Sequence, residues 1–568
     1  MSGTVIFSKK NKICDQNKKI FIGEWLLLNK KNKYKKFNVL KFNEKKKDKL
    51  KDFNYVKKIY KRTLKNITPV LNNINQKNFN EKDWEILIFY FLSNYIFFAY
   101  DKWKLVKNLK KSHNFKPIEI FSYTNNYFIS EDSSNFYTQL KTDNWDDWLF
   151  SKIIKAQKLK FHEKKINKKR IKQKDFNNFN KLKLQRLLFP QNNNKYFLKS
   201  LALPRSLKIK LNLKLNKNLR FYNDINFRKS KKILLKRNLF SLIKSKDEFE
   251  KFIYNTLPEI FPKSYIENFS FIEKNIKFLN WPKKPKIIFT SFDHYHNDAF
   301  KIYTINKIKE GAKFYILQHG HQGHNDFCGT YYEKKICNKY FSWGNISKDN
   351  NVSSLFCTTN IGKIVKKNIK KDILLSYTEF SLKPWKQQAY PRIMSETNLY
   401  KDDIINLINS LSKNLKKNIT LKSFNSEGKK YITNEINKKF KTLDFISTNK
   451  IKRGFEYSKN YNLSIETINS TGFIELLSLN TPVILITNKR FFHVKKEYRK
   501  YYKKLIECNI IFFDIKKATK FIDFNIKNLN HWWFDDQTQK KIKYFCDHVC
   551  KYEGDFNNGL NKIINKIR

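Results

Sequence analysis

Two strand–helix–strand patterns constrain the fold of this chain more than any other feature. In the first, the apolar run 287–290 follows a stiff Trp-Pro-Lys-Lys-Pro connector. A helical stretch runs from Asp298 to Glu310 and stops at Gly311, and a second apolar run follows at 313–317. Strand, helix and strand with short joins indicate a βαβ unit, which builds parallel sheets whose ligands lie beyond the carboxyl ends of the strands.

The second pattern occupies the last third of the chain. It predicts strands over 372–376, 463–465 and 483–486, and helices over 402–415 and 473–479. The polar turn Thr467-Ile468-Asn469-Ser470-Thr471-Gly472 leads into the second helix, which stops at Asn480-Thr481-Pro482. A polar opening therefore precedes a buried helix here, as in a phosphate-binding unit.

The length of 568 residues favours two or three domains. We expect an α/β protein with two Rossmann-like lobes and a large, mostly helical N-terminal region, which includes a helix over 84–103. The predicted parts are residues 1–280, the core of the first, acceptor-side lobe over 281–365, and the second, donor-binding lobe with C-terminal helices over 366–568. Residues 152–244 have only weak periodicity, and we predict no elements there.

The net charge of +66 would ordinarily indicate a nucleic-acid or membrane partner. Lys, Asn, Ile and Phe are abundant while Gly, Pro and Met are scarce, which is the bias that A/T-rich codons produce. The basic residues are also spread along the whole chain rather than confined to one patch. We therefore expect no nucleic-acid partner, and we keep open both a solvated basic surface and attraction to an anionic membrane or substrate.

Cysteine use and apolar runs bear on the cellular location. The seven cysteines form no CxxC pair and are too sparse for a disulfide scaffold. The first residues lack the apolar region of a secretory signal, and the longest apolar run, 86–99, is shorter than the roughly 20 residues of a membrane span. We expect a cytoplasmic protein whose membrane contact, if any, is peripheral on the inner face of the cytoplasmic membrane.

The turn before helix 473–479 has donors suited to a phosphate group. A helix N-terminus leaves backbone N–H groups unpaired and carries partial positive charge. Beside Asn469, the hydroxyls of Ser470 and Thr471 add donors, Gly472 permits close approach, and Glu475 could accept a bond from a sugar or ribose hydroxyl. The same residues fit a simple helix cap. The turn alone leaves the ligand site and the cap equally open.

The loop after strand 313–317 holds three histidines and two glycines in seven positions, Gln318-His319-Gly320-His321-Gln322-Gly323-His324. Its imidazoles could bind a metal ion, act as acid or base, or lie in a solvent-exposed turn. The spacing is loose for a metal site, so we favour acid–base work or donation to a phosphate oxygen, and we expect no metal. Asp298 is a further catalytic candidate that also fits a helix cap.

Several short motifs, taken together, resemble a family of transferases found among O-antigen and other surface-carbohydrate genes, the leptospiral-type transferases. The resemblance extends from about Phe21 to Cys550. In chain order, the motifs are Phe21-Ile22-Gly23-Glu24-Trp25, Trp84-Glu85-Ile86-Leu87-Ile88, Tyr100-Asp101-Lys102-Trp103, Phe289-Thr290-Ser291, Asp298-Ala299-Phe300-Lys301, Gly311-Ala312-Lys313, Gln318-His319-Gly320, Ser342-Trp343-Gly344 and Asn469-Ser470-Thr471.

The resemblance implies a GT-B-like glycosyltransferase of two Rossmann-like lobes. It implies an acceptor-side role for His319 and donor-phosphate binding by Ser470 and Thr471. Glu24 is a catalytic candidate only through its Gly-Glu-Trp motif, and it also fits an ordinary surface carboxylate. The implied substrates are a nucleotide-activated sugar and a glycan or lipid-linked acceptor of O-antigen, lipopolysaccharide or other surface polysaccharide synthesis, with no cofactor and no metal ion.

Two other classes of protein explain part of the sequence. A nucleic-acid-binding protein would account for the charge, but we find neither a confined basic patch with interleaved aromatic residues nor a known module. A non-catalytic basic scaffold at the membrane surface would also account for it, but it gives the two polar loops no purpose.

Overall fold

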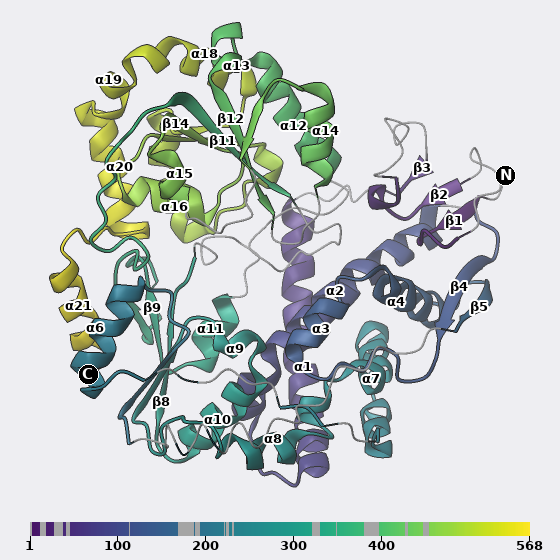
Figure 1. The fold of residues 1–568 in the computed structure, drawn as a ribbon. Coiled ribbons are helices and arrows are strands. Elements are labelled where there is room, and N and C mark those ends of the chain that lie inside the picture. Colours follow the sequence, from purple (N-terminus) through teal and green to yellow (C-terminus); the bar gives the residue numbers. More distant parts are fainter. Residues whose placement is uncertain are drawn as a thin grey trace. The chain divides into compact units, whose positions relative to one another are not determined.

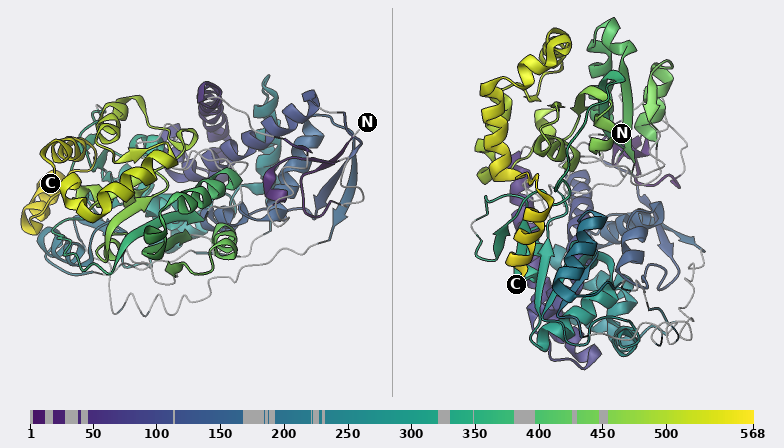
Figure 2. Two further views of the ribbon diagram at one scale, coloured as in Figure 1. Left: turned by 90° about the horizontal axis from the view of Figure 1, so that it is seen from above. Right: turned by 60° about the vertical axis from the view of Figure 1, so that its left-hand side comes forward.

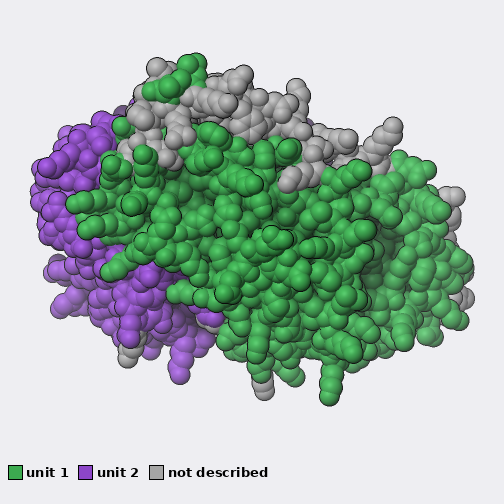
Figure 3. All heavy atoms as spheres, turned by 90° about the horizontal axis from the view of Figure 1, so that it is seen from below, with its two compact units in different colours: residues 1–200, 220–314, 383–386 green, residues 201–219, 315–382, 387–568 purple. Residues whose placement is uncertain are grey.

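The computed structural model, drawn in Figures 1 and 2, describes residues 3–11, 19–27, 38–40, 46–112, 114–167, 184, 187, 193–220, 222, 227–229, 232–320, 330–347, 349–379, 397–425, 430–446 and 454–568. It divides into two compact units (Figure 3). The first comprises Met1–Ser200, Arg220–Phe314 and Lys383–Lys386, and the second comprises Leu201–Leu219, Tyr315–Leu382 and Gln387–Arg568. The three parts expected from the sequence stay a prediction.

The first unit is mainly helical and has two small parallel sheets. One is built from β1 (Thr4–Ile6), β2 (Lys19–Phe21) and β3 (Asn38–Val39), and the other from β4 (Ile118–Tyr123) and β5 (Phe161–Ile166). Its helices are α1 (Lys46–Asn75), α2 (Glu81–Ser112), α3 (Ser133–Gln139), α4 (Asp143–Ala156), α7 (Glu248–Ile260), α8 (Phe269–Ile276), α9 (Asp293–His296) and α10 (Asp298–Lys309), with 3-10 turns η1 (Glu24–Leu26), η3 (Leu235–Leu242) and η4 (Lys263–Tyr265).

Helix α2 explains the longest apolar run of the sequence. Residues 86–99 are buried on nearly every side, apart from half-buried Tyr90. A helix that is apolar all round packs inside a protein core or in a membrane. Within the described part of the chain, every helix is too short or too polar to pass through a bilayer. The run therefore forms part of a core helix, as predicted. Helix α2 is longer at both ends than the predicted 84–103.

A five-stranded sheet contains the first predicted βαβ unit. Its order is β10-β9-β8-β7-β6, with β6 (Tyr196–Lys199), β7 (Ile287–Thr290), β8 (Lys313–Leu317), β9 (Lys339–Ser342) and β10 (Val352–Ser354). The pairs β6–β7, β8–β9 and β9–β10 are parallel. Strands β7 and β8 have the predicted bounds, and α10 ends one residue before the predicted Glu310. The boundary between the two units falls inside β8.

A six-stranded, fully parallel sheet forms the centre of the second unit. Its order is β13-β12-β11-β14-β15-β16, with helices along both faces (Figures 1 and 2). Its strands are β11 (Lys371–Glu379), β12 (Ile419–Asn425), β13 (Asp444–Ile446), β14 (Tyr461–Glu466), β15 (Val483–Ile486) and β16 (Ile511–Phe512). The aliphatic side chains of β11, β14 and β15 are almost fully buried in one continuous core with those of the helices. The expected α/β architecture with parallel sheets is confirmed.

The remaining helices of the second unit lie before, between and after these strands. They are α6 (Arg205–Asn216), α11 (Thr330–Ile336), α12 (Thr397–Ser410), α13 (Lys413–Lys417), α14 (Tyr431–Lys439), α15 (Gly454–Ser458), α16 (Thr471–Ser478), α17 (Arg499–Glu507), α18 (Ile515–Asn525), α19 (Leu529–Trp533), α20 (Asp536–Val549) and α21 (Phe556–Ile567), with 3-10 turns η7 (Lys489–Phe491), η8 (Lys496–Tyr498) and η9 (Ile526–Asn528). The predicted helix 402–415 is thus two helices, α12 and α13, separated by Leu411 and Ser412.

Candidate functional site

The strand order of the six-stranded sheet reverses between β11 and β14. Along the chain, β11, β12 and β13 are added towards one edge, and β14, β15 and β16 are then added on the other side of β11. This is the 3-2-1-4-5-6 order of a doubly wound sheet, in which ligands bind beyond the carboxyl ends of the strands where the order reverses. The predicted polar turn 467–472 follows β14 directly, so it lies at this point.

Ser470 begins helix α16. Its backbone is extended, and its hydroxyl oxygen accepts a hydrogen bond from the Phe473 backbone N–H at 3.1 Å. The same hydroxyl donates to Glu466 Oε2, also at 3.1 Å. Ser470 is therefore the N-cap of α16, and Thr471 and Gly472 are its first helical residues. The cap interpretation holds, and the ligand interpretation remains a prediction because a cap also orients the N–H groups of the first turn.

A row of polar side chains crosses the sheet below this turn. Ser376 of β11 is paired in register with Lys422 of β12 on one side and with Glu466 of β14 on the other. Residues side by side on neighbouring parallel strands point to the same face, so the three side chains form one row. The Lys422 ammonium also lies 4.7 Å from the centre of the Tyr457 ring. No strand over 419–425 is predicted from the sequence, so this row is not predicted either.

Burial changes the proton affinity of both charged members of the row. It raises the pKa of the Glu466 carboxyl, although Lys422 and hydrogen bonds from Ser376 and Ser470 act in the opposite direction. Burial lowers the pKa of the Lys422 ammonium, and the charges of Glu466 and Glu475 oppose this. Perturbed groups of opposite charge at the end of a sheet are typical of a functional site, although ion pairs in a core have the same effect.

Asn469 and Glu475 both have partners that hold the turn in place. Asn469 Nδ2 donates to the Tyr502 hydroxyl of α17 at 3.0 Å. The Glu475 side chain is buried, and its Oε1 accepts a hydrogen bond from Thr359 Oγ1 at 2.6 Å. Asn360 Nδ2 donates to the Glu475 backbone carbonyl at 2.8 Å. Both predicted donor-binding residues therefore have structural partners within the second unit, and contact with a donor stays a prediction.

The histidine loop meets this turn inside the same compact unit. Gln318 is buried, its Nε2 donates to the Gly320 carbonyl at 2.7 Å, and its Oε1 accepts the Trp343 N–H at 2.8 Å. A Cβ atom on Gly320 would lie only 2.8 Å from Thr471 Oγ1. Glycine thus lets the loop pass against the start of α16. His319 lies between Gln318 and Gly320 in the loop and is half-buried.

The other predicted site residues lie either outside the described residues or in the first unit. His321 and His324 lie outside the described residues, as does the side chain of Glu24, whose backbone belongs to η1 in the first unit. Asp298 also belongs to the first unit. The cap of α10 is not Asp298, as the sequence suggested, but Asn297, whose side chain accepts the Phe300 N–H at 2.9 Å.

Asp298 instead has a closed set of partners in the core of the first unit. Its carboxylate accepts hydrogen bonds from Ser264 Oγ at 2.5 Å and Tyr265 OH at 2.6 Å, and Lys301 Nζ lies 2.9 Å away. Burial raises the pKa of this carboxyl, but Lys301 and these donors lower it more, and the net pKa is below the ordinary value. Asp298 is thus a buried, ionised member of a structural network.

A small cavity of about 40 Å³ adjoins the turn on its β15 side. Thr467 and Tyr400 lie on its wall, and their hydroxyl oxygens are 2.6 Å apart. The ring side chains Phe491 and Phe513 line the cavity together with polar Asp403. The cavity therefore combines apolar surface with a few polar groups, as small-molecule sites do.

Among the residues that the structure describes, no group of three or more histidine, cysteine, aspartate or glutamate side chains is arranged to hold a metal ion. His321 and His324, which belong to the predicted loop, are not covered by this statement. The absence of metal and cofactor from the reaction stays a prediction.

Comparisons with known proteins identify the family. The sequence pattern of one family, described as LIC12162 family transferase, matches residues 4–564. No curated protein sequence matches the chain. Similar solved structures include the wall teichoic acid polymerase TagF (11% identity, 53% of this chain and 83% of that chain, TM-score 0.31) and S. aureus MnaA with UDP (12%, 56% and 85%, TM-score 0.32). At such TM-scores, these likenesses carry no argument about this chain.

Proposed function

The chain belongs to the LIC12162 family of transferases, and we propose that it transfers an activated sugar, or a similar phosphate-linked group, from a nucleotide donor. The observation that carries this proposal is the coincidence of three features at one place in the second unit. The strand order reverses there, a capped helix begins there, and the histidine loop touches that helix at Gly320 and Thr471.

We place the donor phosphate at the N-terminus of α16. The N–H groups of the first turn and the helix dipole favour an anion there, and Gly472 leaves room for close approach. Lys422 adds a positive charge on the same sheet face. Partial charges of this kind can offset the charge on a leaving nucleotide, so the proposed transfer uses no metal ion and no cofactor.

We place the base of the nucleoside over the mouth of the adjoining cavity, because Phe491 and Phe513 on its wall offer ring surfaces for a base. His319 then acts as the general base on the acceptor hydroxyl or stabilises the leaving group, since its loop touches the phosphate-binding turn. The proposed acceptor is a glycan or lipid-linked carrier of surface polysaccharide or O-antigen synthesis. The proposed location is the cytoplasm, with peripheral contact to the inner face of the membrane.

A thermal-shift panel of nucleotides and nucleotide sugars tests the donor site. A ligand held at 100 times its dissociation constant adds about 2.7 kcal/mol to the free energy of unfolding. We expect one nucleotide class to stabilise the wild type and to lose this effect in the Ser470→Ala, Thr471→Ala double variant. Ser412→Ala is the matched control, because Ser412 caps α13 in the same unit through the Leu415 N–H.

Either of two results would contradict the proposal. If no nucleotide stabilised the wild type, the proposal of a donor site would be refuted. If the double variant and the wild type responded alike, the nucleotide would bind elsewhere. Salt-sensitive binding to DNA or to anionic vesicles without nucleotide binding would then favour the nucleic-acid or the scaffold alternative.

A further inference from the structure

A wide hollow in the first unit lies at the carboxyl end of β4 and takes no part in the proposed transfer. It has a volume of about 570 Å³ and lies between the turn after β4, one side of α4 and the segment that leads into η3. Strands β4 and β5 are parallel, and the loops beyond the carboxyl ends of parallel strands are where such sheets bind ligands. The hollow is therefore a candidate site of its own.

The charged side chains on its wall compensate one another. Lys152 forms an ion pair with Glu259, and Lys155 Nζ lies 2.8 Å from Glu163 Oε1. The buried Arg237 pairs with Glu267 at 2.6 Å. In a chain of net charge +66, a pocket whose cations are each matched by a carboxylate stands out. Such a lining attracts phosphate weakly and suits an uncharged polar ligand.

Aromatic rings form one wall of the hollow. Tyr123 and Tyr127 have ring centres 5.3 Å apart at an interplanar angle of 32°. Phe128 packs against both tyrosines and lies 5.2 Å from Trp148. Aromatic faces of this kind provide apolar surface at low cost in conformational entropy.

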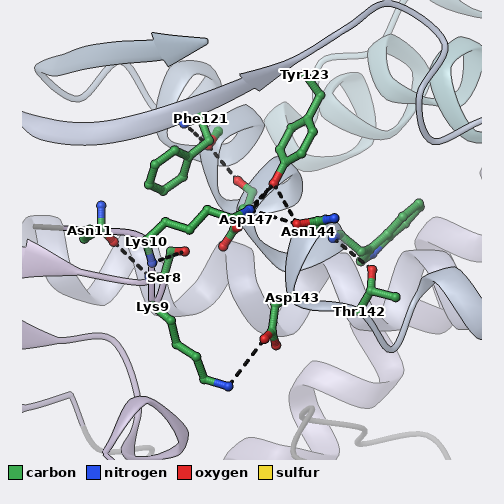
Figure 4. A network of polar contacts seen from close by, with 12 residues as sticks. Ser8, Lys9, Lys10, Asn11, Phe121, Tyr123, Thr142, Asp143, Asn144 and Asp147 are labelled. Carbon is green, nitrogen blue, oxygen red and sulfur yellow. Dashed lines mark hydrogen bonds and ion pairs between the residues drawn. The ribbon is translucent and has the colours of Figure 1, made fainter. Parts of the chain in front are cut away.

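A partly buried network fixes the position of this wall before any ligand binds (Figure 4). Lys10 Nζ donates to the Tyr123 hydroxyl at 2.7 Å and lies 2.5 Å from Asp147 Oδ2. The Tyr123 hydroxyl donates to the same Asp147 oxygen at 3.2 Å. Burial and the Asp147 charge raise the pKa of Tyr123, so its hydroxyl stays protonated and its ring stays oriented.

The rim of the hollow supplies both donors and acceptors. Thr124, Asn125 and Asn126 are exposed in the turn after β4, and Asn238 is exposed on the opposite side. Amide and hydroxyl side chains can donate and accept at once, which matches the hydroxyl groups of a sugar. Rings for the apolar faces of a ligand therefore lie next to amides for its polar edge.

We propose that this hollow binds an uncharged oligosaccharide segment of a glycan. Sugar rings lie against the Tyr123–Tyr127 wall, and their hydroxyls bond to the asparagine amides and to the paired carboxylates. This site goes beyond the proposed donor chemistry, and each of the two proposals can hold without the other.

Calorimetry and tryptophan fluorescence on the full-length chain test this site, with maltohexaose, cellohexaose and chitohexaose as neutral probes and hexagalacturonate as an anionic one. We expect at least one neutral probe to bind and the anionic probe to bind more weakly. Tyr127→Ala should weaken that binding about tenfold, because it removes one stacking surface. Asn125→Ala, which changes only an exposed side chain, should weaken it about fivefold through one lost hydrogen bond.

Two controls separate this site from the donor site and from general damage. Tyr137→Ala removes a half-buried tyrosine of α3, which packs against His296 and lies outside the hollow, and should leave binding unchanged. The Ser470→Ala, Thr471→Ala variant should also bind as the wild type does. Failure of all three neutral probes, stronger binding of hexagalacturonate, or equal binding by the wild type and both pocket variants would overturn the proposal.

Discussion

Gly320 shows how a single residue sets the approach of the two loops. A methyl group there would meet Thr471 Oγ1 at 2.8 Å, well inside ordinary contact distance, so Gly320→Ala must shift the Thr471 side chain or displace one of the loops. We expect the variant to lose about 1–3 kcal/mol of stability, the usual cost of overpacking. The temperature of thermal unfolding and the affinity for the donor should both decrease.

A double-mutant cycle identifies the cause of that loss. Thr471→Ala removes the nearest atom, and the next atoms of Thr471 lie at 3.8 Å and beyond. The pair Gly320→Ala, Thr471→Ala should therefore recover most of the stability lost by Gly320→Ala alone. Strictly additive losses would mean that Gly320 and Thr471 are not in contact.

Glu466 gives a prediction about pH. Folding raises the pKa of this carboxyl above its ordinary value of 4.5, so the folded state binds the proton more tightly than the unfolded state. Below pH 4.5 the carboxyl is protonated in both states, and the raised pKa contributes fully to the free energy of unfolding. As the pH rises through the raised pKa, this contribution is lost. Glu466→Gln carries no proton to lose and should therefore gain stability relative to the wild type as pH rises from 4 to neutrality.

Chemical denaturation of both proteins at several pH values measures this difference. Glu435→Gln on α14, beside Lys438, is a control on the same unit and should follow the wild type. A constant gap between the wild type and Glu466→Gln across that pH range would contradict the assignment.

At the level of elements, Gln318 joins the ends of β8 and β9. Its side chain bonds to the Gly320 carbonyl and to the Trp343 N–H, and both bonds are buried. Gln318→Met keeps the length of the side chain but removes both hydrogen bonds, which should cost about 1–3 kcal/mol for each buried group left without a partner. Hydrogen exchange should rise at 318–320 and 343 while the β11–β14 core stays protected, and unchanged exchange at 343 would refute this role.

The sequence predicted elements well where local patterns decide them. Strands β7, β8 and β15 have the expected bounds, because each is a short apolar run between turn residues. The predicted helix 402–415 begins later than α12 does. The prediction relies on an apolar spacing that starts only after the first turn of α12, which contains the buried Tyr400. Strand β12 was missed because Thr420, Lys422 and Ser423 interrupt its apolar residues, and a strand of that composition is stabilised by its neighbours in the sheet.

The candidate site was predictable only in part for a similar reason. Ser470, Thr471 and the histidine loop were found because chemically suited residues follow apolar runs. Ser376 and Lys422 were not, because their role depends on strand register, which brings residues 46 and 90 positions apart along the chain into one row. The buried partner of Glu475, Thr359, is likewise 116 residues distant in sequence.

For the whole molecule, the excess of basic residues predicts salt-dependent attachment to anionic membranes. The Debye length shrinks from about 30 Å at 0.01 M salt to about 8 Å at 0.15 M. We expect co-sedimentation with vesicles containing phosphatidylserine at low salt, a steep decline as salt rises, and little binding to neutral phosphatidylcholine vesicles. Equal sedimentation with both lipids would mean that charge does not direct the protein to a membrane.

The contact between Gly320 and Thr471 has a consequence for the order of events in the proposed reaction. Because both loops belong to one compact unit, their juxtaposition is established when that unit folds. The proposed base, His319, and the phosphate-binding turn are thus already held near one another in the resting protein. Bringing them together costs no further translational or rotational freedom during the reaction. Only the donor and the acceptor then have to be brought to a fixed point, so their arrival, rather than assembly of the catalytic groups, would set the pace of turnover.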